Sequence, residues 1–87
     1  KVLPELGQYK KAWKILEEGK RIYPDDKAIF SYYQGVLSVN NKVRMADGVK
    51  QLAIAIKYPD TLSANFIDAD EAKKLLEKGE ALIGQSE

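Results

Sequence analysis

Apolar residues recur every three to four positions along most of this chain, which is the spacing of an amphipathic helix. The spacing predicts helices over residues 8–22, 27–40 and 43–57, and a further helix that starts near residue 68. A strict alternation of apolar and polar residues, which would indicate a strand, extends nowhere over more than a few positions. The pattern therefore predicts an all-α fold of four to five helices.

Two prolines divide the predicted helices. A proline cannot continue a helix and also restricts the residue before it. We therefore expect the first helix to end before Pro24 and the third before Pro59. The pattern over residues 60–67 is ambiguous, because it fits either a loop or a loop with one helical turn.

Polar residues at the predicted helix ends suit capping. Asp25 or Asp26 can accept hydrogen bonds from the free amides at the start of the second helix. The asparagine pair at 40–41 can end that helix, because asparagine tolerates the left-handed conformation. Asp68 and Glu71 have the spacing of a capping box at the start of the last helix.

Two stretches of the sequence occur twice. The tripeptide Tyr-Pro-Asp is found at residues 23–25 and again at 58–60, 35 positions later. Residues 12–19 and 72–79 share Ala, Lys, Leu, Glu and Gly at matching positions. Self-similarity at a period of roughly 20 to 50 residues is typical of repeat proteins. In helical repeats of this length, each unit is about one pair of helices. The two echoes together favour a helical repeat.

The residues around the first proline resemble the tetratricopeptide repeat family, whose unit is a pair of antiparallel helices. Counted back from Pro24, the family's aromatic, small and large apolar positions fall on Tyr9, Ala12, Leu16 and Gly19. Counted forward, its apolar positions fall on Phe30, Tyr33 and Leu37, and its small positions on Ala46 and Ala53. Small residues at these positions let neighbouring helices approach closely.

The resemblance implies stacked helix hairpins and a division of the chain into three parts. Residues 1–24 would form a partial repeat, 25–59 a full repeat, and 60–87 a short connector with a C-terminal capping helix. The chain departs from the family pattern in several places: the first unit lacks its first helix, and too few residues lie between Pro59 and Ala72 for a full helix. Gln34 stands where the family has glycine, with Gly35 one position later, and one extra residue separates Ala53 from Pro59.

Composition and charge narrow the possible functions. Basic residues number 14 and acidic residues 13, and the two are interspersed, unlike the basic surface of a nucleic-acid-binding protein. No apolar run approaches the roughly 18 residues of a membrane span. The chain has neither cysteine nor histidine, so it lacks thiolate ligands and the commonest general base. We therefore expect a soluble protein, cytoplasmic by default, that is not an enzyme and needs no cofactor.

One acidic group allows two interpretations. Asp68, Asp70 and Glu71 could be metal ligands, but they lack the glycine and the oxygen-ligand spacing of a calcium loop. Acidic residues in the first turn of a helix also stabilise it through the helix dipole. We interpret the three as capping residues and expect no metal site.

The family resemblance implies a partner-binding surface on the second helix. In such repeats the inner, concave surface is lined by the first helix of each unit, which here carries small and uncharged residues. The candidate partner-binding residues are Ser31, Tyr32, Gln34, Gly35 and Ser38. Gly35 would permit close approach either by a neighbouring helix or by a bound peptide.

Two functions remain open from the sequence. The first is a protein-interaction module that binds another protein or a peptide segment, or that scaffolds an assembly. The second is a C-terminal cap or oligomerisation segment of a longer helical-repeat protein, with no ligand of its own. The second function predicts an apolar face left open on the first helix, and with it a homo-oligomer formed through that exposed N-terminal helix face.

Overall fold

The computed structural model describes residues 6–86, in which every regular element is helical and no strand occurs. The elements are α1 (Leu6–Ile22), the 3₁₀ turn η1 (Pro24–Asp26), α2 (Lys27–Asn41), α3 (Met45–Ala55), α4 (Pro59–Ala64) and α5 (Ala69–Ser86). The predicted all-α class is confirmed, and each predicted helix is present. Residues 1–5 of the predicted partial repeat lie outside the described residues.

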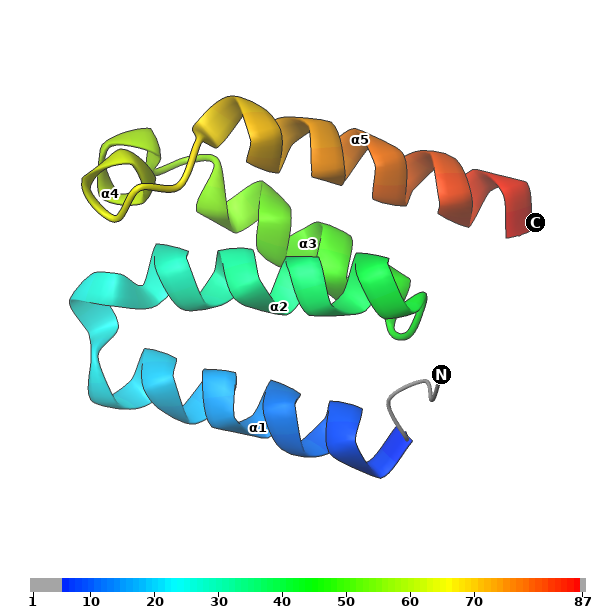
Figure 1. Cartoon of the computed structure of the whole chain (residues 1–87), viewed down its shortest axis with the longest axis horizontal. Coiled ribbons are helices and arrows are strands. Elements are labelled where there is room, and N and C mark those ends of the chain that lie inside the picture. The colour runs from blue at the N-terminus through cyan, green and yellow to red at the C-terminus, as the bar shows by residue number, and fades with distance from the viewer. Residues whose placement is uncertain (1–5, 87) are drawn as a thin grey trace.

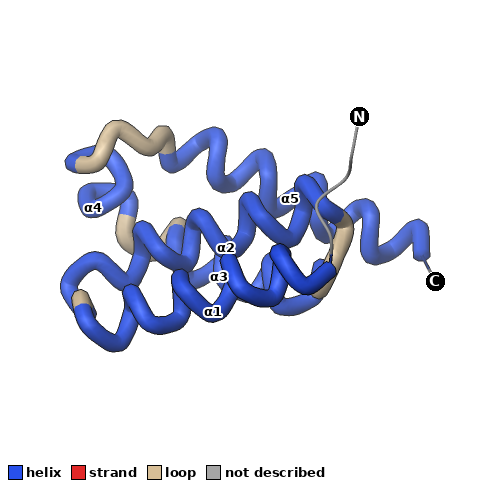
Figure 2. The backbone as a smooth tube through the Cα atoms, turned by 60° about the horizontal axis from the view of Figure 1, so that its bottom comes forward, coloured by secondary structure: helices blue, strands red, loops and turns tan. Residues whose placement is uncertain are grey.

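The four longer helices run in alternating directions (Figure 1). α2 packs against α1 on one side and against α3 on the other, and α5 covers α3 and touches α2. The short helix α4 lies at the end of the molecule where α3 finishes and α5 begins (Figure 1). In Figure 2, α1 lies in front of α2 and α3, and no other described helix covers its outer side.

The two Tyr-Pro-Asp segments adopt the same local structure. Tyr23 has φ −122° and ψ 71°, and Tyr58 has φ −126° and ψ 62°. Each tyrosine precedes a proline that opens a new helical turn, in η1 and in α4 respectively. Proline suits the first position of a helix, because its missing N–H has no intrahelical partner there. The repeated tripeptide therefore has nearly the same backbone conformation in both places.

The structure corrects two of the predicted caps and confirms the third only at Asp68, because Glu71 pairs with Lys74 instead of completing a capping box. No side chain caps the start of α2, because Asp25 and Asp26 form η1 instead. The helix ends with Lys42, not with an asparagine, in the left-handed conformation at φ 55°. At α5 the Oδ1 atom of Asp68 accepts a hydrogen bond of 2.8 Å from the Asp70 amide, as a capping residue does.

The ambiguous segment after Pro59 consists of α4 and a tight turn. The Ile67 amide donates to the Leu62 carbonyl oxygen, and the Phe66 amide donates to that of Ser63. These two bonds form a Schellman motif, in which an apolar contact normally accompanies the hydrogen bonds. Leu62 and Ile67 make this contact inside a buried cluster that also contains Ala28, Ala55 and Ala72. The cluster joins α2, α3, α4 and α5.

The close contacts of α3 differ from the predicted ones. Ala46 is exposed and Ala53 is half-buried, whereas Gly48 and Ala55 are buried. A shift of two residues rotates a side chain by roughly 200° around a helix, so α3 turns nearly the opposite side to its neighbours. Helices still meet at small residues, but Gly48 against Ser38 and Gly35 against Leu52 make the contacts. The register proposed for Ala46 and Ala53 was wrong.

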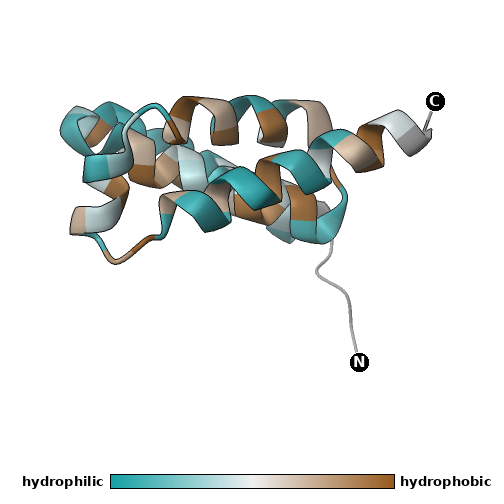
Figure 3. Cartoon of the chain, turned by 90° about the horizontal axis from the view of Figure 1, so that it is seen from above, coloured by the Kyte–Doolittle hydropathy of each residue, from teal (hydrophilic) through white to brown (hydrophobic). Residues whose placement is uncertain are grey.

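Apolar residues of α5 face this assembly. Hydrophobic and hydrophilic residues follow one another along α5 at helical spacing, as Figure 3 shows for the helix that runs to the C-terminus. Ala72 and Gly79 are buried, and Gly79 lies against Val49 and Val39. The apolar stripe that predicted this helix is therefore the side of α5 that packs on α3 and α2.

Candidate functional site

Four of the five candidate partner-binding residues lie inside the molecule. The side chains of Ser31, Gln34 and Ser38 are fully buried, and Gly35 is buried beneath Leu52. A partner cannot reach these residues while α2 stays packed against α1 and α3. The structure therefore corrects the predicted surface at Ser31, Gln34, Gly35 and Ser38. Of the two interpretations of Gly35, close approach by a neighbouring helix is the one observed.

Buried polar residues of α2 connect α1 to α2. The hydroxyls of Tyr9 and Ser38 form a hydrogen bond of 2.9 Å, and the Tyr9 hydroxyl also donates to the Val43 carbonyl oxygen at 3.2 Å. The Gln34 Nε2 atom donates to the Glu17 carboxylate at 2.8 Å and to the Trp13 carbonyl oxygen at 3.3 Å. Burial of a polar group costs free energy unless the group is hydrogen-bonded, so these contacts stabilise the packing of α1 on α2, although the Gln34 Oε1 atom is buried without a partner.

A second group of polar contacts extends from α1 to α3. The Lys20 ammonium donates to the Gln51 side-chain oxygen, which also accepts from the Ser31 hydroxyl at 3.1 Å. Burial lowers the pKa of Lys20, because removal from water disfavours its charged form. The hydrogen bond from Gln34 lowers the pKa of Glu17 from its usual range. The buried polar residues Ser31, Gln34 and Ser38 of α2 therefore link three helices, and none of them is exposed to solvent.

Tyr32 is the one candidate residue that remains partly accessible. It is half-buried against the buried cluster around Leu62 and Ile67. Its ring meets the ring of Tyr33 edge-on, with 5.3 Å between the ring centroids. Desolvation raises the pKa of its phenol above the ordinary value. The two tyrosines are one position apart on a helix, so Tyr33 points away from that cluster, toward α1.

An apolar groove runs between α1 and α2. Two adjoining hollows form it, of about 410 Å³ and about 470 Å³, and Ile15 lines both. We call this surface the α1–α2 groove, and its main apolar side chains are Ile15, Leu16, Ile22, Phe30, Tyr33 and Leu37. Ile15 is 62% exposed, Ile22 54% and Tyr33 46%, although each is a large apolar residue. The groove is therefore open, and its lining is available for contact.

The helical period explains why this side of α1 is apolar and open. Tyr9 and Trp13 are buried on one side of α1, where they pack on α2 and its loop to α3. Ile15 lies two positions beyond Trp13 and therefore points to nearly the opposite side. α1 thus carries two apolar stripes, and a described helix covers only one of them. Phe30 of α2 lines the second hollow, where its ring packs against Gly19 and stacks with the ring of Tyr23.

Positive charge borders the groove. Lys11 and Lys14 line its second hollow, and Lys10 is exposed one position before Lys11. None of the three forms an ion pair with another described residue, whereas Glu18, on the same rim, is paired with Arg21 at 2.6 Å. The rim therefore has excess positive charge, although the net charge of the whole chain is only +1.

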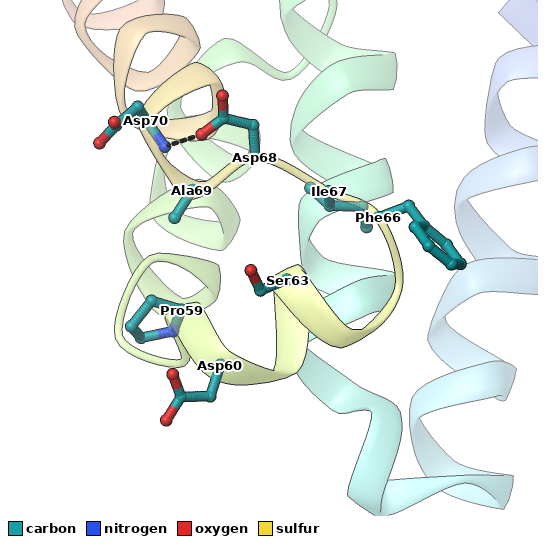
Figure 4. A pocket seen from close by; sticks show the side chains of 8 residues that line it. All are labelled: Pro59, Asp60, Ser63, Phe66, Ile67, Asp68, Ala69 and Asp70. Atoms are coloured by element: carbon teal, nitrogen blue, oxygen red, sulfur yellow. Dashed lines mark hydrogen bonds between the residues drawn. The ribbon is translucent and has the colours of Figure 1, made fainter.

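The turn between α4 and α5 forms a second distinctive surface (Figure 4). A hollow of about 440 Å³ lies there, and three carboxylates line it, from Asp60, Asp68 and Asp70. Phe66 borders this hollow but points away from it, and its side chain is fully exposed at 100%. Its backbone has φ 63°, a left-handed conformation that costs a residue with a side chain about 1–2 kcal/mol.

The described residues do not show the features of a metal or membrane site. In residues 6–86 no cluster of three or more acidic side chains is arranged to hold a metal ion. No described helix is both long and apolar enough to cross a bilayer. The α1–α2 groove and the turn around Phe66 carry four of the exposed large apolar side chains, from Ile15, Ile22, Tyr33 and Phe66.

The sequence contained a signal for this arrangement. Ala28, Ser31, Gly35 and Ser38 follow one another at helical spacing, and a stripe of small residues marks close helix packing as well as a ligand surface. Phe30, Tyr33 and Leu37 form the neighbouring stripe, which the resemblance assigned to packing inside the repeat. The structure exchanges the two roles: the small stripe is the interior, and the large apolar stripe lines the groove.

No protein-family model matches this chain, and no curated protein and no solved structure shows significant similarity to it. The resemblance to tetratricopeptide repeats therefore stays a prediction.

Proposed function

We propose that this chain is a protein-interaction module that binds an apolar helical segment of another polypeptide in the α1–α2 groove. The open groove is the single observation that carries the proposal. Contiguous apolar surface on a soluble chain marks a site of interaction with another molecule.

The shape of the groove supports a helical occupant. It follows the α1–α2 junction, from Asn41 at one end of the pair to Tyr23 at the other. An amphipathic helix binds such a groove by placing side chains at every third or fourth position into it. The lysines on the rim favour a segment with acidic residues beside its apolar stripe, since complementary charge speeds association and selects the partner.

A second candidate function uses the same groove. A further helix of the same polypeptide could cover it, in which case the chain would be one part of a longer repeat protein and would have no ligand of its own. The matching backbone at Tyr23 and Tyr58 favours this candidate, because it shows a local unit that occurs twice. In both candidates the groove is the contact surface, and they differ in the source of the covering helix.

Selection from a peptide library tests the proposed function. The immobilised chain is expected to select peptides with apolar residues at helical spacing and acidic residues between them. Calorimetric titration of a selected peptide should show binding that Ile15→Asp abolishes, because the variant replaces an apolar side chain shared by both hollows with a carboxylate that loses its hydration when the peptide covers it.

Ala46→Asp is the matched control. It introduces the same side chain at an exposed alanine on α3, away from the groove, and should leave peptide binding unchanged. Selected peptides that bind Ile15→Asp as well as the unmodified chain would contradict the assignment of the groove.

A further inference from the structure

Phe66 has two unfavourable properties that its position does not require. The residue occupies the left-handed position of a Schellman motif, which is normally glycine because glycine has no side chain to clash there. Its ring is also fully exposed, so it contributes nothing to the core. Neither the turn nor the packing of α4 on α5 explains a phenylalanine at this position.

The surroundings of Phe66 make it a projecting apolar group with an acidic border. Figure 4 shows the ring directed away from the other labelled side chains, and Figure 3 shows the hydrophobic loop before α5 at the edge of the molecule. Asp60, Asp68 and Asp70 line the adjacent hollow, and none of them forms an ion pair with another described residue. The turn therefore combines one aromatic anchor with negative charge.

The α1–α2 groove has the complementary properties. It is concave and apolar where the Phe66 turn is convex and apolar, and Lys11 and Lys14 border it where three aspartates border Phe66. Buried aromatic anchors dominate the binding energy of protein interfaces, and charges around them determine specificity and association rate. Both halves of such an interface are present on one chain, on different elements.

We propose that the occupant of the groove is a second copy of this chain, which inserts Phe66 between α1 and α2. This inference rests on the proposed function and names a partner for that same groove, which enters it through one aromatic residue of a turn instead of through a helix. The contact joins two different surfaces, so a pair of copies still offers one free groove and one free Phe66. Interfaces of this head-to-tail kind extend into larger assemblies or close into rings.

A mixing experiment tests the proposal. Analytical ultracentrifugation of the unmodified chain should show species larger than a dimer whose amount rises with concentration. Phe66→Gly removes the anchor and keeps the groove, and Ile15→Asp keeps the anchor and blocks the groove. Each variant alone should be a monomer. An equimolar mixture should form a dimer and nothing larger, because it has one working anchor and one working groove.

Three results would overturn the proposal. The unmodified chain could remain a monomer up to millimolar concentration, Phe66→Gly could assemble as the unmodified chain does, or the mixture could fail to pair. Thermal unfolding checks the fold of the variants, and Phe66→Gly should raise the melting temperature while it abolishes assembly. A mere loss of folding cannot produce that combination.

The peptide titration separates this inference from the proposed function. Phe66→Gly should still bind a library-selected peptide, since its groove is intact. Peptide binding without self-assembly would overturn only the second-copy proposal, and loss of both in the unmodified chain would overturn the proposed function as well.

Discussion

The two sides of α2 differ in residue size and in what covers them. Toward α3, α2 presents Ser31, Gly35 and Ser38, which are small and fully enclosed. Toward α1 it presents Tyr33 and Leu37, which are large and line an open groove. Size and apolarity alone do not determine which side of a helix is buried. Small residues are enclosed because two backbones can meet there, and we propose that the large residues stay exposed because the surface they form binds another molecule.

The largest expected effect concerns the enclosed side. Leu52→Ala removes a fully buried side chain that packs against Gly35, and should lower the free energy of unfolding by about 2–5 kcal/mol. Ile15→Ala, in the groove, should change it by less than about 0.5 kcal/mol. Urea unfolding followed by circular dichroism measures both. Equal losses would show that the groove contributes to the core.

The glycines of α3 and α5 give the next contrast. A methyl group added by Gly48→Ala would overlap Ser38, and overpacking of this kind costs about 1–3 kcal/mol. Gly84→Ala adds a methyl group to a helical position with no neighbouring atom within 4 Å, and should stabilise the fold by up to about 1 kcal/mol. The same urea titration compares them. Stabilisation by Gly48→Ala would refute the close α2–α3 contact.

The left-handed turn at Phe66 provides a third test. Phe66→Gly should raise the free energy of unfolding by about 1 kcal/mol, because glycine adopts the observed φ without strain. Phe66→Ala retains a Cβ atom, so it should give little of this gain. Thermal and urea unfolding of the two variants distinguish backbone strain from loss of the ring. Equal stabilities would place the effect in the ring.

The smallest effect concerns the acid side of the pH range. The pKa of Glu17 lies below its usual value of 4.5 in the folded chain, chiefly because Gln34 donates a hydrogen bond to the carboxylate. The ionised carboxylate therefore stabilises the fold above that value, and the stabilisation is lost as the pH falls through the lowered pKa. Glu17→Gln should reduce this acid dependence by less than about 1 kcal/mol, since the group is half exposed. Urea unfolding across the acid range measures it.

Helix positions were predictable from the sequence because they depend on local signals. The two prolines ended helices as expected, and Asp68 caps α5 through a bond between near neighbours. The rotation of α3 was not predictable in this way. Its sequence carries one stripe at Ala46, Val49 and Ala53 and another at Gly48, Leu52 and Ala55. Only the positions of α2 and α5 decide which stripe is enclosed.

The prediction of a partner-binding surface at Ser31, Gln34, Gly35 and Ser38 was wrong for a related reason. Polar residues such as Ser31 and Gln34 were expected at the surface, but their bonding partners Gln51 and Glu17 lie 20 and 17 residues away in the sequence. Hydrogen bonds between distant residues cannot be inferred from local spacing. Once these bonds form, polar residues can be buried, and the large apolar residues of the other stripe remain for the groove.

The most direct test of the contrast between the two sides of α2 maps a bound library-selected peptide by amide NMR. We predict chemical-shift changes that centre on Ile15, Ile22, Tyr33 and Leu37, with the amides of Ser31, Ser38 and Leu52 nearly unchanged. Changes centred instead on the small residues that face α3 would contradict the account, because they would show that a partner enters between helices assigned here to the interior.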